Sequence, residues 1–80
     1  MSDLQPRLIR CFQAVFPELS ESKAARASAS GLTAWDSVAT ATLAAAVEEE
    51  FGIEFEAEEI ERINSFQSCL DLLTARQSLQ

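Results

Sequence analysis

Apolar residues recur at helical spacing near the start of the chain. The residues that share one helical face, at positions i, i+4, i+7, i+8 and i+11, are Leu4, Leu8, Cys11, Phe12 and Val15. We therefore expect a first helix over about residues 3–16, with the charge of Asp3 favourable in its first turn. Pro17 ends this helix, because the residue before a proline avoids the helical conformation.

The apolar periodicity is lost between Pro17 and Trp35. This stretch consists largely of Ser, Ala and charged residues and contains Gly31, so we expect a long connection that could include a broken turn around residues 22–27. A connection of this length is unusual in so small a domain. Such loops often carry function.

A second helix is predicted from Asp36 through an alanine-rich stretch to Phe51. Asp36 is a suitable N-cap, and Gly52 a suitable left-handed residue at the C-terminal end. Leu43, Val47 and Phe51 recur every four residues, so the helix buries a narrow apolar stripe. The alternating residues 53–55 are expected to form a loop, since nothing else in the chain could pair with them as a strand.

Two further helices are predicted in the last third of the chain. A short third helix covers residues 58–63 with Ile60 and Ile63 inward. Ser65 is the expected N-cap of a fourth helix over about residues 66–77, whose buried residues are Phe66, Cys69, Leu70 and Leu73. The predicted fold is all-α: a small four-helix bundle with a short third helix and a long loop between the first two helices. Eighty residues make one domain, residues 1–80.

The composition supports a folded protein with a real core. Hydrophobic residues make up 48% of the chain and charged residues 24%, with two Gly and two Pro. Cys11 and Cys69 both lie in apolar-periodic segments and are interpreted as small buried hydrophobes, which favours a reducing, cytoplasmic location. The first residues do not resemble a secretory signal, and no run approaches about 18 apolar residues, so we expect a soluble, unprocessed protein.

Negative charge is concentrated in the middle of the chain. The formal net charge is −7, and nine acidic residues lie between Asp36 and Glu61 without a Lys or Arg. Such a surface repels nucleic acid and anionic membranes, which excludes both as expected partners, whereas basic protein patches would fit it. On charge alone, a solvated acidic face that only keeps the domain soluble is an equal alternative. The charged faces leave no evident large apolar patch for self-association, so we expect a monomer.

Catalytic motifs are lacking. The sequence contains no histidine, no Cys-x-x-Cys pair and no Gly-rich phosphate loop. Glu48, Glu49 and Glu50 are consecutive and would project about 100° apart around a helix, so they cannot converge on one substrate atom. They also lack the alternating oxygen ligands of a calcium loop. We expect no catalytic residue and no metal site, and a small enzyme is the least favoured class.

Ser37 lies where the long connection meets the second helix, in the sequence Trp35-Asp36-Ser37-Val38. A hydroxyl at this position is exposed, and a phosphate ester on it would lie near unsatisfied backbone amides. The local alternative, that Asp36 or Ser37 only caps the helix, is favoured on local grounds. Ser37 has no candidate base to activate it. Trp35 is interpreted as a hydrophobic plug for the loop, with a partner-facing role as the alternative.

A longer pattern changes this balance. The residues Leu32-Thr33-Ala34-Trp35-Asp36-Ser37-Val38, then Leu43, the segment 48–54, Glu58-Glu59 and Ile63 resemble acyl carrier proteins of bacterial fatty-acid and specialised pathways. The family motif Asp-Ser-Leu appears here as Asp36-Ser37-Val38, and the register needs no gap from Asp36 to about Leu73. The match is therefore much longer than the three-residue motif.

The resemblance implies a function. Ser37 would carry 4′-phosphopantetheine, attached from coenzyme A by a separate phosphopantetheinyl transferase that uses a divalent metal. Asp36 would be read by the transferase, and Val38 would lie beside the arm, whose thiol carries acyl groups as thioesters between enzymes. Two alternatives stay open: an aminoacyl or peptidyl carrier, and an interaction module of the same fold that never receives the arm.

The resemblance also implies partner and cargo residues. Acids that would dock on basic patches of acyl-loading and acyl-using enzymes are Asp36, Glu48, Glu49, Glu54, Glu58 and Glu59. Ala39, Thr42 and Ala45 replace acidic or large apolar residues common in fatty-acid carriers, which favours a specialised pathway. Residues matching an acyl cavity are Leu43, Val47, Phe51, Phe55, Ile63, Cys69 and Leu73. They could also be simply the core, and the bulk of Phe55 could shorten a cavity.

Overall fold

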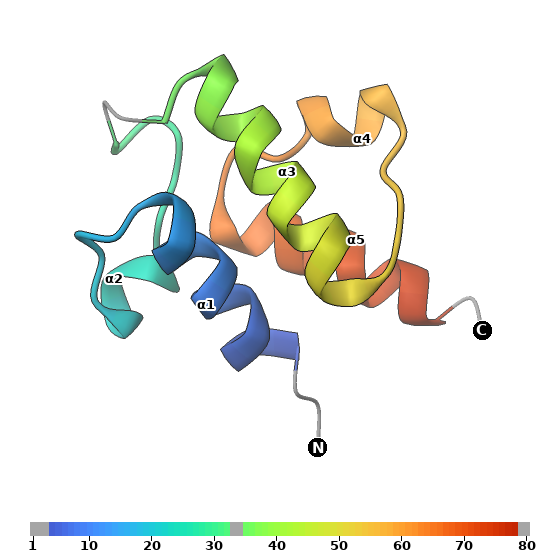
Figure 1. The fold of residues 1–80 in the computed structure, drawn as a ribbon, viewed down its shortest axis with the longest axis horizontal. Helices are drawn as coiled ribbons and strands as arrows, with labels where there is room; N and C mark the ends of the chain where they lie inside the picture. The colour runs from blue at the N-terminus through green and yellow to red at the C-terminus, as the bar shows by residue number, and fades with distance from the viewer. Residues whose placement is uncertain (1–3, 33–34, 79–80) are drawn as a thin grey trace.

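In the computed structural model, which describes residues 4–32 and 35–78, the chain is all-α (Figure 1). The helices of the described residues are α1 (Leu4–Val15), α2 (Glu21–Ala24), α3 (Ser37–Phe51), α4 (Ala57–Glu61) and α5 (Phe66–Ser78). Five helices are therefore described, and the expected count of four is not confirmed. The additional helix is α2, which occupies the place of the broken turn expected around residues 22–27. Asp3, expected in the first helical turn, lies outside the described residues.

The three long helices α1, α3 and α5 form the body of the molecule, and α2 and α4 lie in the connections between them (Figure 1). α1 packs against both α3 and α5. Its buried residues are those of the predicted apolar face, Leu4, Leu8, Cys11 and Phe12. Val15, the last position of that face, is only partly buried.

Local capping chemistry sets the ends of α3 as predicted. The Asp36 carboxylate accepts a hydrogen bond from the backbone N–H of Ala39 at 2.8 Å, which makes Asp36 the N-cap. Gly52 ends the helix with φ 66°, in the left-handed region that glycine enters without a steric penalty. Both predicted caps are confirmed.

The last third of the chain differs from the prediction in one element. α4 begins at Ala57 and ends at Glu61, so Ile63 lies beyond it, although Ile63 is still buried and Ile60 is partly buried against the core. Ser65 accepts a hydrogen bond from the N–H of Ser68 at 3.0 Å, as expected of the residue that caps α5. Leu70, expected to be buried, is half-buried and packs against the core.

Aromatic side chains fill the centre of the core. The ring of Phe12 lies 5.2 Å from Phe66 and 5.5 Å from Trp35, both in edge-on geometry, and Phe16 lies 5.5 Å from Trp35. Rings at these distances add to the free energy of apolar burial. Trp35 is buried among them, so its prediction as a hydrophobic plug is confirmed.

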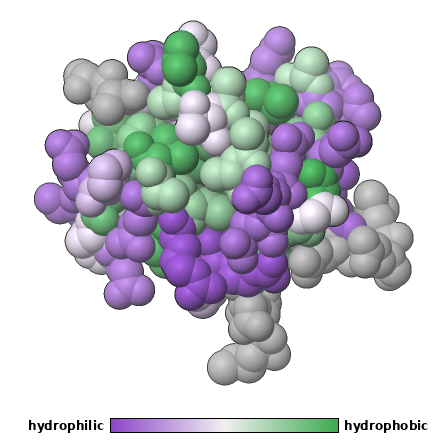
Figure 2. All heavy atoms as spheres, viewed as in Figure 1, coloured by the Kyte–Doolittle hydropathy of each residue, from purple (hydrophilic) through white to green (hydrophobic). Residues whose placement is uncertain are grey.

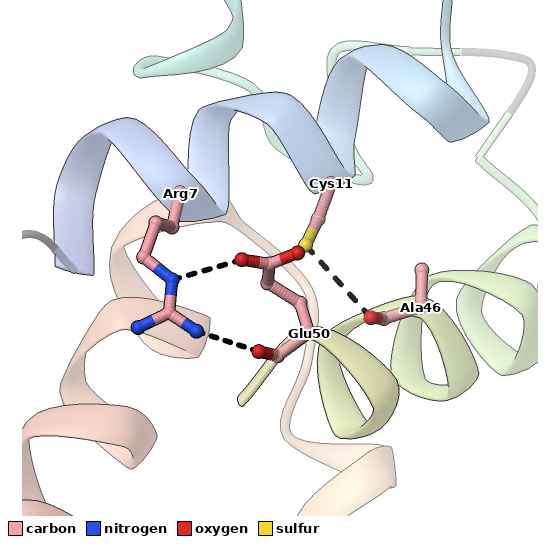
Figure 3. Close-up of polar contacts among 4 residues, drawn as sticks. All are labelled: Arg7, Cys11, Ala46 and Glu50. Carbon is pink, nitrogen blue, oxygen red and sulfur yellow. Dashed lines mark hydrogen bonds and ion pairs between the residues drawn. The ribbon is translucent and has the colours of Figure 1, made fainter. Parts of the chain in front are cut away.

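One polar cluster ties the start of α1 to the end of α3 (Figure 3). The Arg7 guanidinium donates from Nε to the Glu50 carboxylate at 2.8 Å and from Nη2 to the Glu50 carbonyl oxygen at 2.6 Å. The same guanidinium lies over the Phe51 ring, 4.4 Å from its centroid.

Within residues 4–32 and 35–78, no helix combines the length and apolar character needed to cross a bilayer.

Candidate functional site

Ser37 is the first residue of α3 and is exposed. Its hydroxyl makes no hydrogen bond with the described part of the chain, while the neighbouring Asp36 carboxylate is engaged as the cap. No described side chain hydrogen-bonds to this hydroxyl, and the Asp36 and Glu61 carboxylates that line the same cleft make no hydrogen bond to it. The Ser37 hydroxyl is thus accessible, and no described contact activates it as a nucleophile.

A short hydrogen-bond relay holds the turn that presents Ser37. The indole Nε1 of Trp35 donates to Thr40 Oγ1 at 2.8 Å, and that hydroxyl donates to the carbonyl oxygen of Asp36 at 3.0 Å. The backbone N–H of Thr40 also donates to the Asp36 carbonyl, at 2.9 Å. Because Trp35 is packed in the aromatic core, the turn carrying Ser37 is fixed to the core on one side and to the first turn of α3 on the other.

A cleft of about 430 Å³ opens beside Ser37. Its residues come from the end of the long connection, the first turns of α3, α4 and the segment after α4; they are Ala29, Trp35, Asp36, Ser37, Thr40, Ala41, Ile60, Glu61, Ile63 and Asn64. Trp35 and Ile63 are buried and form its floor, while Ser37, Asp36 and Glu61 are exposed at its rim. The cleft is thus apolar in depth and acidic at its mouth.

The long connection is fastened at the far side of this cleft. The N–H of Ala29 donates to the Asn64 carbonyl at 2.8 Å, and the N–H of Phe66 donates to the Ala27 carbonyl at 2.9 Å, around an isolated antiparallel bridge between Ser28 and Ser65. These bonds bring Ala29 next to Asn64, which lies far from it in the sequence. The connection that the sequence marked as a candidate functional segment therefore forms one wall of the cleft.

The outward face of α3 next to Ser37 carries small and mostly apolar side chains. Val38 is 72% exposed, and the residues that continue its face, Ala41, Thr42 and Ala45, are also exposed. Figure 2 shows hydrophobic residues gathered over α3, with hydrophilic residues around them. Val38 follows Ser37 directly and nothing in the described structure covers it, while its place beside an arm stays a prediction.

The predicted docking acids fall into two groups. Three of them have partners within the fold: the Asp36 carboxylate caps α3 by accepting the N–H of Ala39, the Glu48 carboxylate accepts the N–H of Phe55 at 2.7 Å, and the Glu59 carboxylate accepts the N–H of Glu56 at 2.8 Å and a hydrogen bond from Arg76. The hydrogen bond from Glu56, followed by that from Arg76, lowers the pKa of Glu59. Glu49, Glu54 and Glu58 are exposed and make no side-chain hydrogen bond or ion pair with the described residues.

The residues predicted to line an acyl cavity lie in the core. Leu43, Val47, Phe55, Ile63, Cys69 and Leu73 are buried, and Phe51 is half-buried under Arg7. Of these, only Ile63 contributes to the cleft beside Ser37. Phe55 packs near the Arg76 guanidinium, 5.4 Å from its ring centroid, rather than at the cleft. Whether these core residues can separate around an acyl chain stays a prediction.

Both cysteines are free thiols in the core. Burial raises the pKa of Cys69 to about 12, and burial followed by the charge of Glu50 raises the pKa of Cys11. The Cys11 thiol lies 3.9 Å from the carbonyl oxygen of Ala46 (Figure 3). The reactive form of a cysteine is the thiolate, and burial with a raised pKa disfavours that form at both positions. Neither thiol is therefore suited to act as a nucleophile.

Several residues of the cleft were not singled out from the sequence. Thr40 lies four residues after Asp36, and a threonine at that spacing can bond the carbonyl four residues before it, so a signal existed for its contact with Asp36. Ala29 and Asn64 gave no such signal, since a backbone hydrogen bond brings them together, and Glu61 reaches the cleft as the last residue of α4.

No protein-family model matches the sequence, and a search of curated proteins finds no match. Thr33 and Ala34, part of the stretch that resembles acyl carrier proteins, lie outside the described residues.

Proposed function

We propose that this chain is an acyl carrier protein whose Ser37 hydroxyl receives a 4′-phosphopantetheine arm. The observation that carries the proposal is the placement of Ser37: an exposed hydroxyl on the first residue of a 15-residue helix, at the rim of an apolar cleft. α1, α3, α4 and α5 lie at the four helical segments predicted from the sequence, and α2 lies within the long connection.

The surroundings of Ser37 suit a phosphodiester. The Asp36 carboxylate accepts a hydrogen bond from the N–H of Ala39. The N–H groups of Ser37 and Val38 have no partner within the helix and point toward its N-terminal end. An anion there is favoured by these donors and by the helix dipole. The residues that would lie against the arm are Ser37 and Val38, with Asp36 exposed for recognition by the transferase.

The modification itself requires a second protein. The Ser37 oxygen forms a bond to the phosphorus that bears pantetheine, the anhydride bond of coenzyme A breaks, and 3′,5′-ADP leaves. The hydroxyl proton passes to a base of the transferase, because no described carboxylate hydrogen-bonds to the Ser37 hydroxyl. The arm supplies a thiol for acyl thioesters, and this chain supplies the tether, which raises the effective concentration of the cargo at each partner enzyme.

The exposed acids support docking to basic patches on partner enzymes. Glu49, Glu54 and Glu58 are free of internal contacts in the described structure and are the candidates we retain first, while Glu48 and Glu59 also serve the fold. The small apolar face formed by Val38, Ala41, Thr42 and Ala45 lacks acids, which favours partners of a specialised pathway over those of primary fatty-acid synthesis. Two buried free thiols are in keeping with a reducing, cytoplasmic setting.

The test is a mass measurement. The purified protein is incubated with coenzyme A, a divalent metal and a promiscuous phosphopantetheinyl transferase. We expect the mass of one arm to be added, and Ser37→Ala to abolish the addition. Ser22→Ala, which removes an exposed serine from α2, is the matched control and should be modified like the unchanged protein. An unchanged mass with several transferases would contradict the proposal and favour an unmodified interaction module.

A further inference from the structure

Trp35 separates the cleft beside Ser37 from the aromatic core. Its side chain lines the cleft and yet is only 6% exposed. On the core side, its ring lies 5.5 Å from both Phe12 and Phe16. A residue that lines the cleft and packs its ring in the aromatic core lies at the partition between them.

The indole is held in this position by a polar contact as well as by packing. Its N–H donates to Thr40 Oγ1 at 2.8 Å, and Thr40 itself lines the cleft and bonds to the Asp36 carbonyl at 3.0 Å. Swinging the indole aside would break this bond and leave a buried N–H without a partner, which is costly. The contact therefore keeps the partition closed.

We propose that Trp35 is a specificity-determining residue that limits the length of acyl group the cleft can take up. This inference rests on the proposed modification of Ser37, because the occupant is an acyl group carried by the arm on that residue. Trp35 and Ile63 line the cleft of about 430 Å³ and are themselves buried, so an acyl chain that outgrows the cleft meets the packed core at these two residues. Acyl groups short enough for this open cleft are taken up, whereas the remainder of a longer chain stays outside in solvent.

The test is a chain-length series. Ser37 is loaded with arms bearing acetyl, butyryl, octanoyl or palmitoyl groups, and the melting temperature of each form is compared with that of the unacylated arm. In the unchanged protein we expect stabilisation to level off after the short groups. In Trp35→Leu, which shortens the partition, stabilisation should continue to rise with the octanoyl and palmitoyl groups.

Three further variants isolate the cause. Phe66→Leu is the matched control, an aromatic-to-aliphatic change at a buried core residue that neither lines the cleft nor belongs to the predicted acyl cavity, and it should keep the profile of the unchanged protein. Thr40→Val removes the partner of the indole N–H and should extend the profile toward longer chains, while Thr40→Ser keeps the hydroxyl and should not. These two variants decide the question if Trp35→Leu does not fold.

Two results would overturn the proposal. One is a steady rise of stabilisation with chain length in the unchanged protein. The other is an identical profile in Trp35→Leu, or in Thr40→Val where Trp35→Leu does not fold. Trp35 is the single tryptophan, so its emission is a second readout: it should be the same with the butyryl and palmitoyl arms, both of which enter the cleft, and a shift between them would show that the indole moves aside. An arm that never attaches refutes both proposals, whereas a loaded Ser37 with either contrary profile refutes this one alone.

Discussion

Arg76 on α5 donates a hydrogen bond to the Glu59 carboxylate on α4, and this pair connects two helices that share little other contact. The same carboxylate oxygen accepts the N–H of Glu56 at 2.8 Å and so caps the first turn of α4. Arg76 also lies over the Phe55 ring, 5.4 Å from its centroid. One ionised carboxylate thus orders the short helix that forms part of the cleft wall.

The stability of the fold should depend on the ionisation of Glu59. Its pKa is lowered in the folded state by the Glu56 and Arg76 hydrogen bonds, so the unfolded chain takes up the proton first as the pH falls. The stability it contributes is complete above the ordinary glutamate pKa of about 4.3 and is lost as the pH falls from there through the lower folded value. Thermal unfolding measured across this range should show a shallower acid loss in Glu59→Gln.

Glu58→Gln is the control for this measurement, because Glu58 is exposed on the same helix and has no internal partner in the described structure. It should retain the steep acid dependence of the unchanged protein. Parallel pH profiles for Glu59→Gln and the unchanged protein would show that the capping contact does not contribute.

Glu48 and Glu49 are neighbours in the sequence, but they should contribute differently to the free energy of unfolding. Glu48→Ala removes the acceptor of the partly buried Phe55 N–H, which we expect to cost about 1–3 kcal/mol. Glu49→Ala should change the free energy of unfolding by less than about 0.5 kcal/mol, since its side chain is exposed and without a partner in the described structure. Urea unfolding of both variants measures the difference.

Docking can then be tested at Glu49 without a change in stability. Glu49→Lys should weaken turnover of the loaded carrier by a partner enzyme, and added salt should reduce the difference from the unchanged protein because it screens exposed charges. Equal turnover at low salt would remove Glu49 from the docking surface.

The sequence predicted the elements whose signals are local. The caps Asp36 and Gly52 set the ends of α3, and each acts through its own backbone or side-chain geometry within a few residues. The sequence predicts only a broken turn where α2 lies, because four residues are too few to show helical periodicity. The spacing of Ile63 from Ile60 fits a helical face and so predicts Ile63 inside the third helix. In the structure the helix ends at Glu61, and Ile63 is buried in the segment that follows.

The sequence pattern could not predict the cleft, for a different reason. Its far wall depends on the backbone bond from Ala29 to Asn64, and a bond between main-chain atoms leaves no trace in side-chain identity. Trp35 was correctly expected in the core, but its second contact, with Thr40, joins the core to the turn at Ser37. Hydroxyl partners of this kind follow from three-dimensional placement and not from periodicity.

The Arg7 cluster at the other end of α3 should make a modest contribution to stability (Figure 3). The Arg7 and Glu50 side chains are 35% and 40% exposed, so water and salt weaken their ion pair. Adding the contact with the Phe51 ring, we expect Arg7→Met to cost about 1 kcal/mol in urea unfolding. Arg10→Met, an exposed position on the same helix, is the control, and an equal cost for both would assign the effect to helix charge in general.

The two buried cysteines give a direct readout of the arm. The pKa of Cys69 is raised to about 12 and that of Cys11 is also raised, and both side chains lie in the core. In the unmodified protein at about pH 8, a thiol-specific chromogenic reagent should therefore react slowly, at a rate that follows unfolding. Once Ser37 carries the arm, one thiol should react at once while the other two remain slow. A fast thiol before modification would show that Cys11 or Cys69 opens to solvent, and Cys11→Ala and Cys69→Ala would identify which of them does so.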